Sequence, residues 1–257
     1  MLTIKKVLSA AIIAAAITAP AGAQSPKPTV VLVHGAFADA SSWNGVISRL
    51  HADGFEVVAV ANPLRGVKTD GDYVARIVSS IKMPVVLVGH SYGGAVISAS
   101  AVGAKNVKAL VFVGAFAPDI GESAADLSAK YPGSTLEPTL DEPVILADGG
   151  KDMYIAKEKF HGQFAADVPA AVAALMADTQ RPVTLSALTE AAPGAAWKEI
   201  PSYFIYGEKD KNIPARALGW MAERASSKET VVVSGASHVV MVSHPAEVVK
   251  VIEEAAK

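Results

Sequence analysis

The sequence predicts an α/β protein in which a mostly parallel sheet of about six strands is flanked by helices and carries an inserted helical cap. Short apolar runs alternate with stretches of helical spacing, which favours βαβ units. The apolar runs lack polar alternation, as is typical of parallel strands buried on both faces. The alternation stops once, in a Pro-containing middle segment, and then resumes.

The first half of the predicted sheet consists of short apolar runs that turn residues bring to an end. The β-branched run Thr29–Val33 stops at His34-Gly35, and the following helical stretch stops at Gly54. In order, the pattern predicts strand Thr29–Val33, helix Ser42–Asp53, strand Phe55–Val60, helix Thr69–Ile81, strand Val85–Val88, helix Tyr92–Val102 and strand Val107–Val113.

The pattern changes after Phe116. Residues 117–197 contain seven prolines mixed with helical stretches, of which Phe160–Leu175 is the clearest. Because this segment is strand-poor and lies between two sheet strands, we interpret it as a cap inserted into one domain whose core is residues 29–116 and 198–257; an independent domain is the alternative. The core resumes with strand Ser202–Tyr206, helix Pro214–Ala225, strand Glu229–Val233 and helix Pro245–Ala256.

Composition excludes several classes of protein. The chain has 257 residues, of which 51% are hydrophobic and 19% charged, so it is not disordered. Without cysteine it has no disulfide, thiolate metal site or cysteine nucleophile. Its 23 basic and 25 acidic residues give a net charge of −2, so no nucleic-acid partner is expected.

Residues 1–23 are typical of a secretory signal peptide. Lys5 and Lys6 precede an uncharged apolar run from Val7 to Thr18, and the small triplet Ala21-Gly22-Ala23 follows. The run is shorter than the roughly 20 residues that cross a bilayer, with an uncleaved anchor as the alternative. We expect cleavage after Ala23, a mature domain of residues 24–257 without a membrane span, and a periplasmic or secreted location.

The strongest functional signal is Gly89-His90-Ser91-Tyr92-Gly93, a G-x-S-x-G pentapeptide. It directly follows an apolar strand and directly precedes a helix, which is the setting of a nucleophile elbow. So tight a turn needs small residues two positions before and two positions after the nucleophile, and Gly89 and Gly93 meet this need. Ser91 is therefore the predicted nucleophile, with a plain glycine turn as the alternative.

A serine hydroxyl needs a general base and an acidic group that orients the base. In this architecture the order along the chain is serine, acid, histidine. His238 lies just after the last predicted strand and is the expected base. Asp210 follows the preceding strand and is the expected acid, with Glu208 and Asp119 as competitors.

Acyl transfer through a serine also needs two N–H donors for the oxyanion. One is expected from Tyr92, directly after the nucleophile. The other is expected from Ala36, in the loop after the first strand, with its neighbour Phe37 as the alternative.

These residues resemble those of the α/β-hydrolase superfamily over residues 29–257. Within it, the chain resembles the group of plant methylesterases, hydroxynitrile lyases and bacterial carboxylesterases. The resemblance implies a triad of Ser91, Asp210 and His238, with Ala36 and Tyr92 as oxyanion donors. The segments that carry it are Val31–Ala36, Trp43, Leu87–Gly94, Val111–Pro118 with Asp119, Tyr206–Asp210 and Ser237-His238.

The same resemblance favours ester hydrolysis over lyase chemistry. The lyases of this group carry Thr after the loop histidine and Lys after the catalytic histidine, whereas this chain has Gly35 and Val239 there. No cation is then available at that position for a cyanide leaving group. The open alternatives are a lyase, cleavage of an amide, lactone or C–C bond by the same residues, and a slow-turnover ligand-binding module.

The cap is expected to supply a pocket for a small or medium apolar ester over Ser91. No cofactor or metal is implied, because the sequence contains no H-E-x-x-H, phosphate loop or dinucleotide-binding glycine motif. The oligomeric state stays open, a homodimer included. The predicted pocket residues are Phe37, Tyr131, Tyr154, Phe160, Phe164, Met176, Trp197 and Met241.

Overall fold

A six-stranded parallel sheet runs through the structure, a computed structural model that describes residues 27–257. All neighbouring strands in it are parallel, which confirms the predicted fold class. The signal peptide predicted over residues 1–23 lies outside the described residues. The strand order is β2 (Val57–Val60), β1 (Thr29–Val33), β3 (Val85–His90), β4 (Val107–Val113), β8 (Ser202–Gly207) and β9 (Glu229–Val233).

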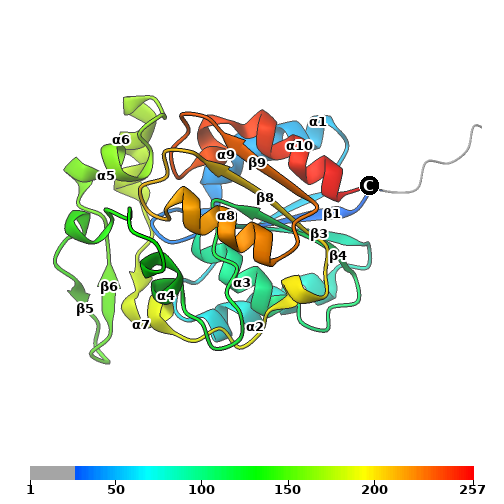
Figure 1. The fold of residues 1–257 in the computed structure, drawn as a ribbon, viewed down its shortest axis with the longest axis horizontal. Coiled ribbons are helices and arrows are strands. Elements are labelled where there is room, and N and C mark those ends of the chain that lie inside the picture. The colour runs from blue at the N-terminus through cyan, green and yellow to red at the C-terminus, as the bar shows by residue number, and fades with distance from the viewer. Residues whose placement is uncertain (1–26) are drawn as a thin grey trace, which may run out of the picture.

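Helices cover both faces of this sheet (Figure 1). Parallel strands need crossover connections, and the helices between them provide these. On one face α1 packs against α10, and on the other α2 packs against α3. The core helices are η1 (Ala40–Trp43), α1 (Asn44–Ala52), α2 (Val67–Ser80), α3 (Tyr92–Ser100), α8 (Ala215–Arg224), α9 (Val240–Ser243) and α10 (Pro245–Ala255).

The central strands are buried on both faces. Every residue of β1 and β3 is buried, as their unbroken apolar runs predict. Between β4 and β8, the rings of Phe112 and Phe204 stack with their centroids 4.6 Å apart. The sheet is therefore a rigid support for the loops at its carboxyl edge, where ligands of such sheets bind.

The core elements agree closely with the sequence pattern. Strands β1, β4 and β9 have the predicted bounds, and the other predicted core elements begin or end within about two residues of prediction. The pattern missed α9, one helical turn that begins two residues after His238. Four residues are too few to show a helical period.

Residues 117–197 lie between β4 and β8 in the chain and contain more strand than expected, and α5, α6, β5 and β6 lie at one end of the molecule (Figure 1). Three strands of two or three residues form an antiparallel sheet in the order β5-β6-β7. Strands this short leave no readable alternation in the sequence. The segment contains α4 (Ala124–Ala129), η2 (Glu137–Thr139), β5 (Val144–Ile145), β6 (Lys151–Met153), α5 (Lys157–Phe164), α6 (Ala170–Thr179), β7 (Val183–Thr184), α7 (Leu185–Thr189) and η3 (Ala196–Lys198).

The single helix predicted over Phe160–Leu175 is wrong. The structure has two helices, α5 and α6, with a break from Ala165 to Pro169. The proline has no N–H to donate and disfavours helical backbone in the residue before it, so the first helix ends and a new one begins after the proline.

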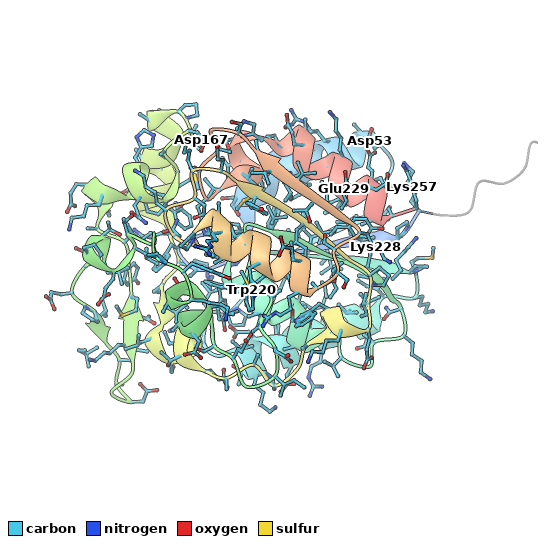
Figure 2. The ribbon with its side chains drawn as sticks, viewed as in Figure 1. Asp53, Asp167, Trp220, Lys228, Glu229 and Lys257 are labelled. Carbon is cyan, nitrogen blue, oxygen red and sulfur yellow. The ribbon has the colours of Figure 1, made fainter. Side chains whose placement is uncertain are left out.

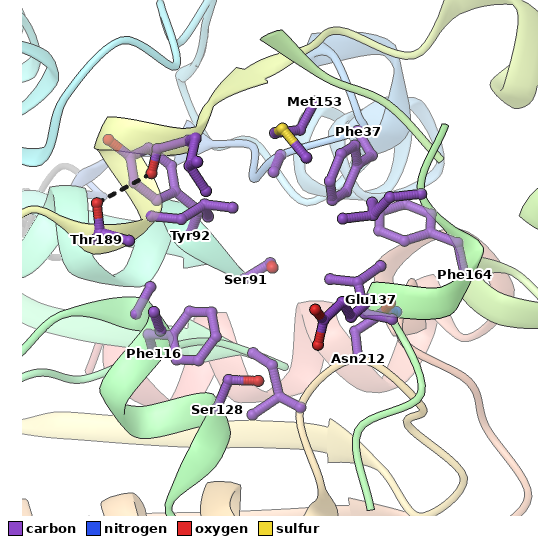
Figure 3. A pocket seen from close by; sticks show the side chains of 18 of the residues that line it. Phe37, Ser91, Tyr92, Phe116, Ser128, Glu137, Met153, Phe164, Thr189 and Asn212 are labelled. Atoms are coloured by element: carbon purple, nitrogen blue, oxygen red, sulfur yellow. Dashed lines mark hydrogen bonds between the residues drawn. The ribbon is translucent and has the colours of Figure 1, made fainter. Parts of the chain in front are cut away.

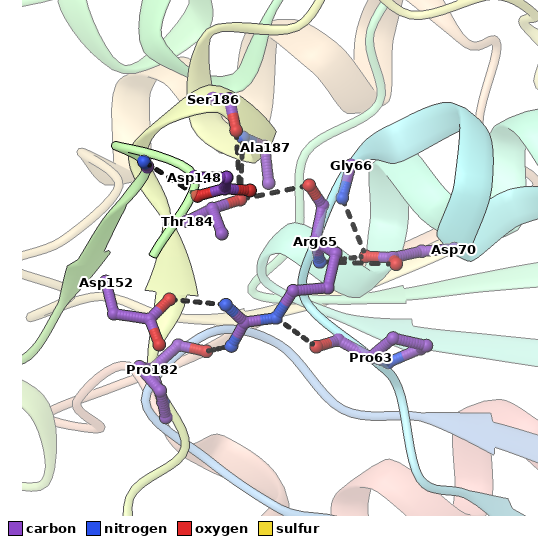
Figure 4. Close-up of polar contacts among 11 residues, drawn as sticks. Pro63, Arg65, Gly66, Asp70, Asp148, Asp152, Pro182, Thr184, Ser186 and Ala187 are labelled. Carbon is purple, nitrogen blue, oxygen red and sulfur yellow. Dashed lines mark hydrogen bonds and ion pairs between the residues drawn. The ribbon is translucent and has the colours of Figure 1, made fainter. Parts of the chain in front are cut away.

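The inserted segment is tied to the core through the loop that precedes α2 (Figure 4). The Arg65 guanidinium forms an ion pair with Asp152 of β6 and donates to the Pro182 carbonyl oxygen at 3.3 Å. Thr184 of β7 donates its backbone N–H to the Leu64 carbonyl and its hydroxyl to the Arg65 carbonyl. The antiparallel sheet is therefore fastened at one edge to the core.

Charged side chains lie around the outside of the molecule (Figure 2). Asp167 lies near the helices of the inserted segment, whereas Lys228 and Lys257 lie at the other end of the sheet. Within residues 27–257, no helix combines the length and the hydropathy needed to cross a bilayer.

Candidate active site

Ser91 lies between β3 and α3 with a backbone conformation that side chains rarely adopt. Its φ is +53° and its ψ is −122°, a strained combination for a residue other than glycine. The two glycines of the pentapeptide allow the turn to close. A Cβ on Gly89 would lie 2.5 Å from the Gly93 carbonyl oxygen, and one on Gly93 would lie 2.4 Å from that of Val33. The turn presents Ser91 at the floor of a cavity (Figure 3).

His238 and Asp210 meet as a buried pair in the loops after β9 and β8. His238 Nδ1 lies 2.7 Å from Asp210 Oδ2, and neither side chain is more than 1% exposed. The second carboxylate oxygen of Asp210 accepts the backbone N–H groups of Asn212 at 2.8 Å and Ile213 at 2.9 Å. An imidazole that donates from Nδ1 leaves Nε2 free to accept a proton.

The two competitors for the acid lie elsewhere. Glu208 is exposed and accepts from the Gly235 N–H and the Ser234 hydroxyl, which lowers the pKa of its carboxyl. Asp119 forms an ion pair with Lys198 at 2.6 Å, and this contact lowers the pKa of its carboxyl. Among the described residues, Asp210 is the carboxylate bonded to His238.

Ser91 and His238 line the same cavity. No hydrogen bond joins the Ser91 hydroxyl to His238 within residues 27–257. Catalytic hydrogen bonds are often long in empty sites and tighten only when substrate binds.

The backbone N–H groups of Tyr92 and Ala36 lie near Ser91 and have no hydrogen-bond partner in the described part of the chain. Tyr92 is the first residue of α3, so its N–H has no acceptor within the helix. Ala36 lies in the loop after β1, and both residues line the cavity. The alternative donor, the Phe37 N–H, is already bonded to the Arg181 carbonyl oxygen at 3.1 Å. Of the two donors expected from this loop, the Ala36 N–H is the one that is not bonded to another residue.

His34 holds the peptide that carries the Ala36 N–H. The Asn62 backbone N–H donates to His34 Nε2 at 3.1 Å, so the proton lies on Nδ1, which donates to the Gly35 carbonyl at 2.9 Å. The Gly35 carbonyl and the Ala36 N–H belong to one planar peptide, so holding the oxygen also sets the direction of the N–H. Burial lowers the pKa of His34 to about 4, which keeps this ring neutral.

Two further buried side chains support the site through contacts that the sequence did not predict. His90 packs against His238 with ring centroids 4.7 Å apart, and burial lowers its pKa well below the usual value. The Tyr92 hydroxyl donates to Asp70 Oδ2 at 2.9 Å, which anchors the first turn of α3 to α2. Burial raises the pKa of the Asp70 carboxyl. Neither contact had a local signal, because each joins segments far apart in the sequence.

The cavity over Ser91 has a volume of about 490 Å³, a size that suits a small ligand. Two of the predicted pocket residues, Phe37 and Phe164, line it opposite Phe116 (Figure 3). Most of the apolar wall comes from residues outside the eight predicted ones. These are Phe116, Leu136, Leu140, Met153, Leu185, Leu188 and Ile213.

The other six predicted pocket residues lie outside this wall. Phe160 and Met241 are fully buried, and Phe160 packs behind Phe164 with ring centroids 5.0 Å apart. Trp197 donates its indole N–H to the Pro118 carbonyl at 2.7 Å. The remaining three are Tyr131, which packs on Trp220, Tyr154, which is half-buried in the inserted segment, and Met176, which lines a second hollow beyond Phe37.

No cluster of three or more histidine, aspartate or glutamate side chains suited to a metal ion occurs in residues 27–257. The site brings together a serine hydroxyl, a histidine bonded to a carboxylate, and the Ala36 and Tyr92 amides.

Comparison with known proteins places the chain in a family. The family model described as the alpha/beta hydrolase family matches residues 30–251. The chain is 28% identical over 250 residues to the alpha/beta hydrolase nvfD of Aspergillus novofumigatus, covering 90% of this chain and 97% of that protein. It is 26% identical over 245 residues to the alpha-hydroxynitrile lyase of Arabidopsis thaliana, covering 85% and 93%.

A solved structure shows the same fold. The crystal structure of polyneuridine aldehyde esterase matches with a TM-score of 0.78 at 21% identity, covering 90% of this chain and 100% of that one. The matched family range contains the sheet apart from its first residue, the inserted segment and every residue of the site described above. The chain belongs to the alpha/beta hydrolase family.

Proposed function

We propose that this protein is a serine hydrolase that cleaves small to medium apolar carboxylic esters through an acyl-enzyme. The observation that carries the proposal is the buried His238–Asp210 pair, with its 2.7 Å contact, in the same cavity as Ser91 on its strained turn. The apolar wall of the cavity supports an uncharged substrate.

In the proposed reaction, His238 Nε2 takes the Ser91 proton while the Ser91 oxygen attacks the ester carbonyl carbon. The Ala36 and Tyr92 amides donate to the oxyanion of the tetrahedral intermediate. When this intermediate collapses, the C–O bond to the alcohol breaks and His238 passes its proton to the leaving oxygen. Water, deprotonated by His238, then attacks the acyl-enzyme and releases the acid.

Hydroxynitrile lyase activity is the main alternative, since one relative carries that name. Position 35 weighs against it. A Cβ on Gly35 would lie 2.6 Å from the Ser91 Cβ and 2.7 Å from the His90 carbonyl oxygen, so this backbone has no room for a threonine. Val239, at the position of the lyase lysine, is fully buried and uncharged.

Turnover of p-nitrophenyl and methyl aryl esters by wild type and Ser91→Ala tests the proposal. We expect wild type to hydrolyse short esters and the variant to lose roughly 10⁴-fold or more in kcat. Mandelonitrile is assayed for released cyanide alongside. No ester turnover by folded wild type would contradict the esterase proposal, and cyanide release without ester turnover would replace it with a lyase. Full activity in Ser91→Ala would remove Ser91 from its role.

We also propose that the chain is exported after cleavage behind Ala23, on the strength of the charged, apolar and small segments of residues 1–23. Amino-terminal sequencing of the protein recovered from a bacterial periplasm should begin at Gln24. Recovery of the intact amino terminus in the membrane fraction would favour the uncleaved anchor.

A further inference from the structure

The break between α5 and α6 carries a carboxylate that reaches the loop of the proposed base. Asp167 lies in this break, where the inserted segment meets the core (Figure 2). Its Oδ1 accepts a hydrogen bond from the hydroxyl of Ser237, which directly precedes His238 in the chain. Ser237 is 2% exposed and the Asp167 side chain 18% exposed, so little water competes for this hydrogen bond.

Hydrogen bonds within the break hold its backbone on both sides of Asp167. The Ala165 N–H donates to the His161 carbonyl at 3.1 Å, and the Val168 N–H donates to the Ala165 carbonyl at 3.0 Å. His161 Nε2 lies 2.9 Å from the Val168 carbonyl oxygen, which can only accept, so this ring nitrogen carries the proton. These bonds limit the directions in which the Asp167 carboxylate can point.

The same carboxylate faces the other end of the segment that carries the proposed base. Asp167 Oδ2 is buried and lies 3.5 Å from Nδ1 of His244, the residue before α10. Residues 238–243, which contain His238 and α9, run between Ser237 and His244. One side chain of the inserted segment therefore contacts both ends of the stretch that holds the base.

Other contacts hold the His238 ring but leave its approach to Ser91 open. Asp210 is bonded to Nδ1, and the rings of His90 and Phe164 lie with their centroids 4.7 and 5.1 Å from that of His238. Within residues 27–257, no hydrogen bond joins this ring to the Ser91 hydroxyl. A misplacement of about 1 Å between reacting groups can lower a rate about 100-fold, so the placement of the backbone beside His238 matters.

We propose that Asp167 is a positioning residue for His238, because its hydrogen bond to Ser237 sets where the loop places the His238 ring relative to Ser91. This inference rests on the proposed function, in which His238 takes the Ser91 proton. Asp167 belongs to the inserted segment, so this segment positions the base in addition to forming much of the pocket wall. Loss of the carboxylate should slow the reaction of Ser91 and leave ester binding nearly unchanged.

Two reactions of Ser91 measure this effect. The first is hydrolysis of p-nitrophenyl butyrate, from which kcat and KM are determined separately. The second is the reaction with diethyl p-nitrophenyl phosphate, in which the Ser91 oxygen bonds to phosphorus, p-nitrophenolate leaves and His238 takes the Ser91 proton. We expect Asp167→Ala to lower kcat and the second-order rate constant for the phosphate about tenfold or more, and to change KM at most about twofold.

Further variants separate positioning from a general loss of structure. Asp167→Asn keeps an oxygen for the Ser237 hydroxyl and should recover most of the rate. Ser237→Ala removes the other half of the bond, so it should match Asp167→Ala, and the double variant should lose no more than either single one. Asp178→Ala is the matched control, because this aspartate of α6 is 61% exposed and pairs with Lys157. Its rates should equal those of wild type.

The outcomes separate this inference from the proposed function. Full rates in Ser237→Ala, losses that add in the double variant, or no recovery in Asp167→Asn would overturn the inference and leave ester hydrolysis in place, even if Asp167→Ala does not fold. If wild type hydrolyses no ester but reacts with the phosphate, the proposed function fails and the phosphate rates of the variants decide the inference alone. If wild type reacts with neither compound, both are overturned.

Discussion

The carboxyl edge of the sheet and the inserted segment above it are built in different ways. At the edge, Gly35 and Gly93 bring backbone against backbone, and His34 clamps the peptide that carries one of the free amides. The inserted segment instead uses short strands and exposed ion pairs such as Lys157–Asp178, whose side chains are 68% and 61% exposed. The residues of the proposed triad are therefore placed by close backbone packing that allows little change, whereas the inserted segment above them depends partly on exposed contacts.

The largest loss of activity at the carboxyl edge of the sheet is expected for Asp210→Asn. An asparagine there favours the wrong tautomer of His238, so we expect kcat for ester hydrolysis to fall about 10⁴-fold. Steady-state kinetics measures this loss. Glu208→Gln and Asp119→Asn are matched controls, because both residues are bonded elsewhere, and they should keep activity within about threefold of wild type. A larger loss in Asp119→Asn than in Asp210→Asn would reverse the assignment of the acid.

The buried His34, which holds the Gly35 peptide, makes the free energy of unfolding depend on pH. With a folded pKa of about 4 and an ordinary value of 6.5, His34 takes up its proton in the unfolded chain before it does so in the folded one. Stability is therefore complete above pH 6.5 and falls as the pH drops toward about 4, by about 3 kcal/mol in total.

Urea unfolding at a series of pH values between 4 and 7 measures this dependence. His34→Asn removes the titrating ring, so the free energy of unfolding of this variant should fall less steeply than that of wild type as the pH is lowered. The difference in slope should correspond to the uptake of about one proton. His51→Asn, at an exposed position of α1, should follow wild type. Parallel curves for wild type and His34→Asn would show that this ring does not titrate as proposed.

Two glycine substitutions compare the regions directly. Gly93→Ala puts a Cβ 2.4 Å from the Val33 carbonyl oxygen and should cost about 1–3 kcal/mol of stability. Gly162→Ala lies on the exposed side of α5 with no atom within 4 Å of the added Cβ, so it should add about 0.5–1 kcal/mol through higher helix propensity. Denaturant midpoints give both values, and shifts of the same sign would remove the contrast.

The smallest expected effect concerns the link between the regions. Arg65→Leu removes the ion pair to Asp152 and the bond to the Pro182 carbonyl, both partly exposed contacts, so it should cost at most about 1 kcal/mol of stability. Because this link holds the inserted segment over the cavity, we expect KM to rise about threefold while kcat stays the same.

In the double variant, Asp152→Asn should cost little stability beyond that lost in Arg65→Leu, because both changes break the same ion pair. Lys157→Met, which breaks an exposed pair within the inserted segment, should leave KM unchanged. An unchanged KM in Arg65→Leu would show that the link does not shape the pocket.

The strands and the residues of the proposed triad could be predicted from the sequence because their signals are local. An unbroken apolar run indicates a buried strand, and Gly89 and Gly93 around Ser91 indicate a tight turn wherever they follow such a run. His238 and Asp210 follow strands whose carboxyl ends meet at one edge of a parallel sheet. Their proximity was therefore predictable without any knowledge of side-chain contacts.

The pocket wall could not be predicted in this way. Phe160 and Phe164 lie on one turn of the same helix, yet Phe164 lines the cavity and Phe160 lies behind it. The composition of the inserted segment showed which residues were apolar. The break at Pro169 and the three short strands decided which of them face Ser91.

The sheet, the turn at Ser91 and the positions of the proposed acid and base can be read from the sequence, because each depends on neighbouring residues and on the rule that parallel strands end at one edge. Only the packed chain brings the Arg181 carbonyl to the Phe37 N–H and the Asn62 N–H to His34, which then holds the Gly35 peptide. Each of these contacts joins residues that are distant in the sequence. No local sequence pattern indicates them, because they form only when the chain packs.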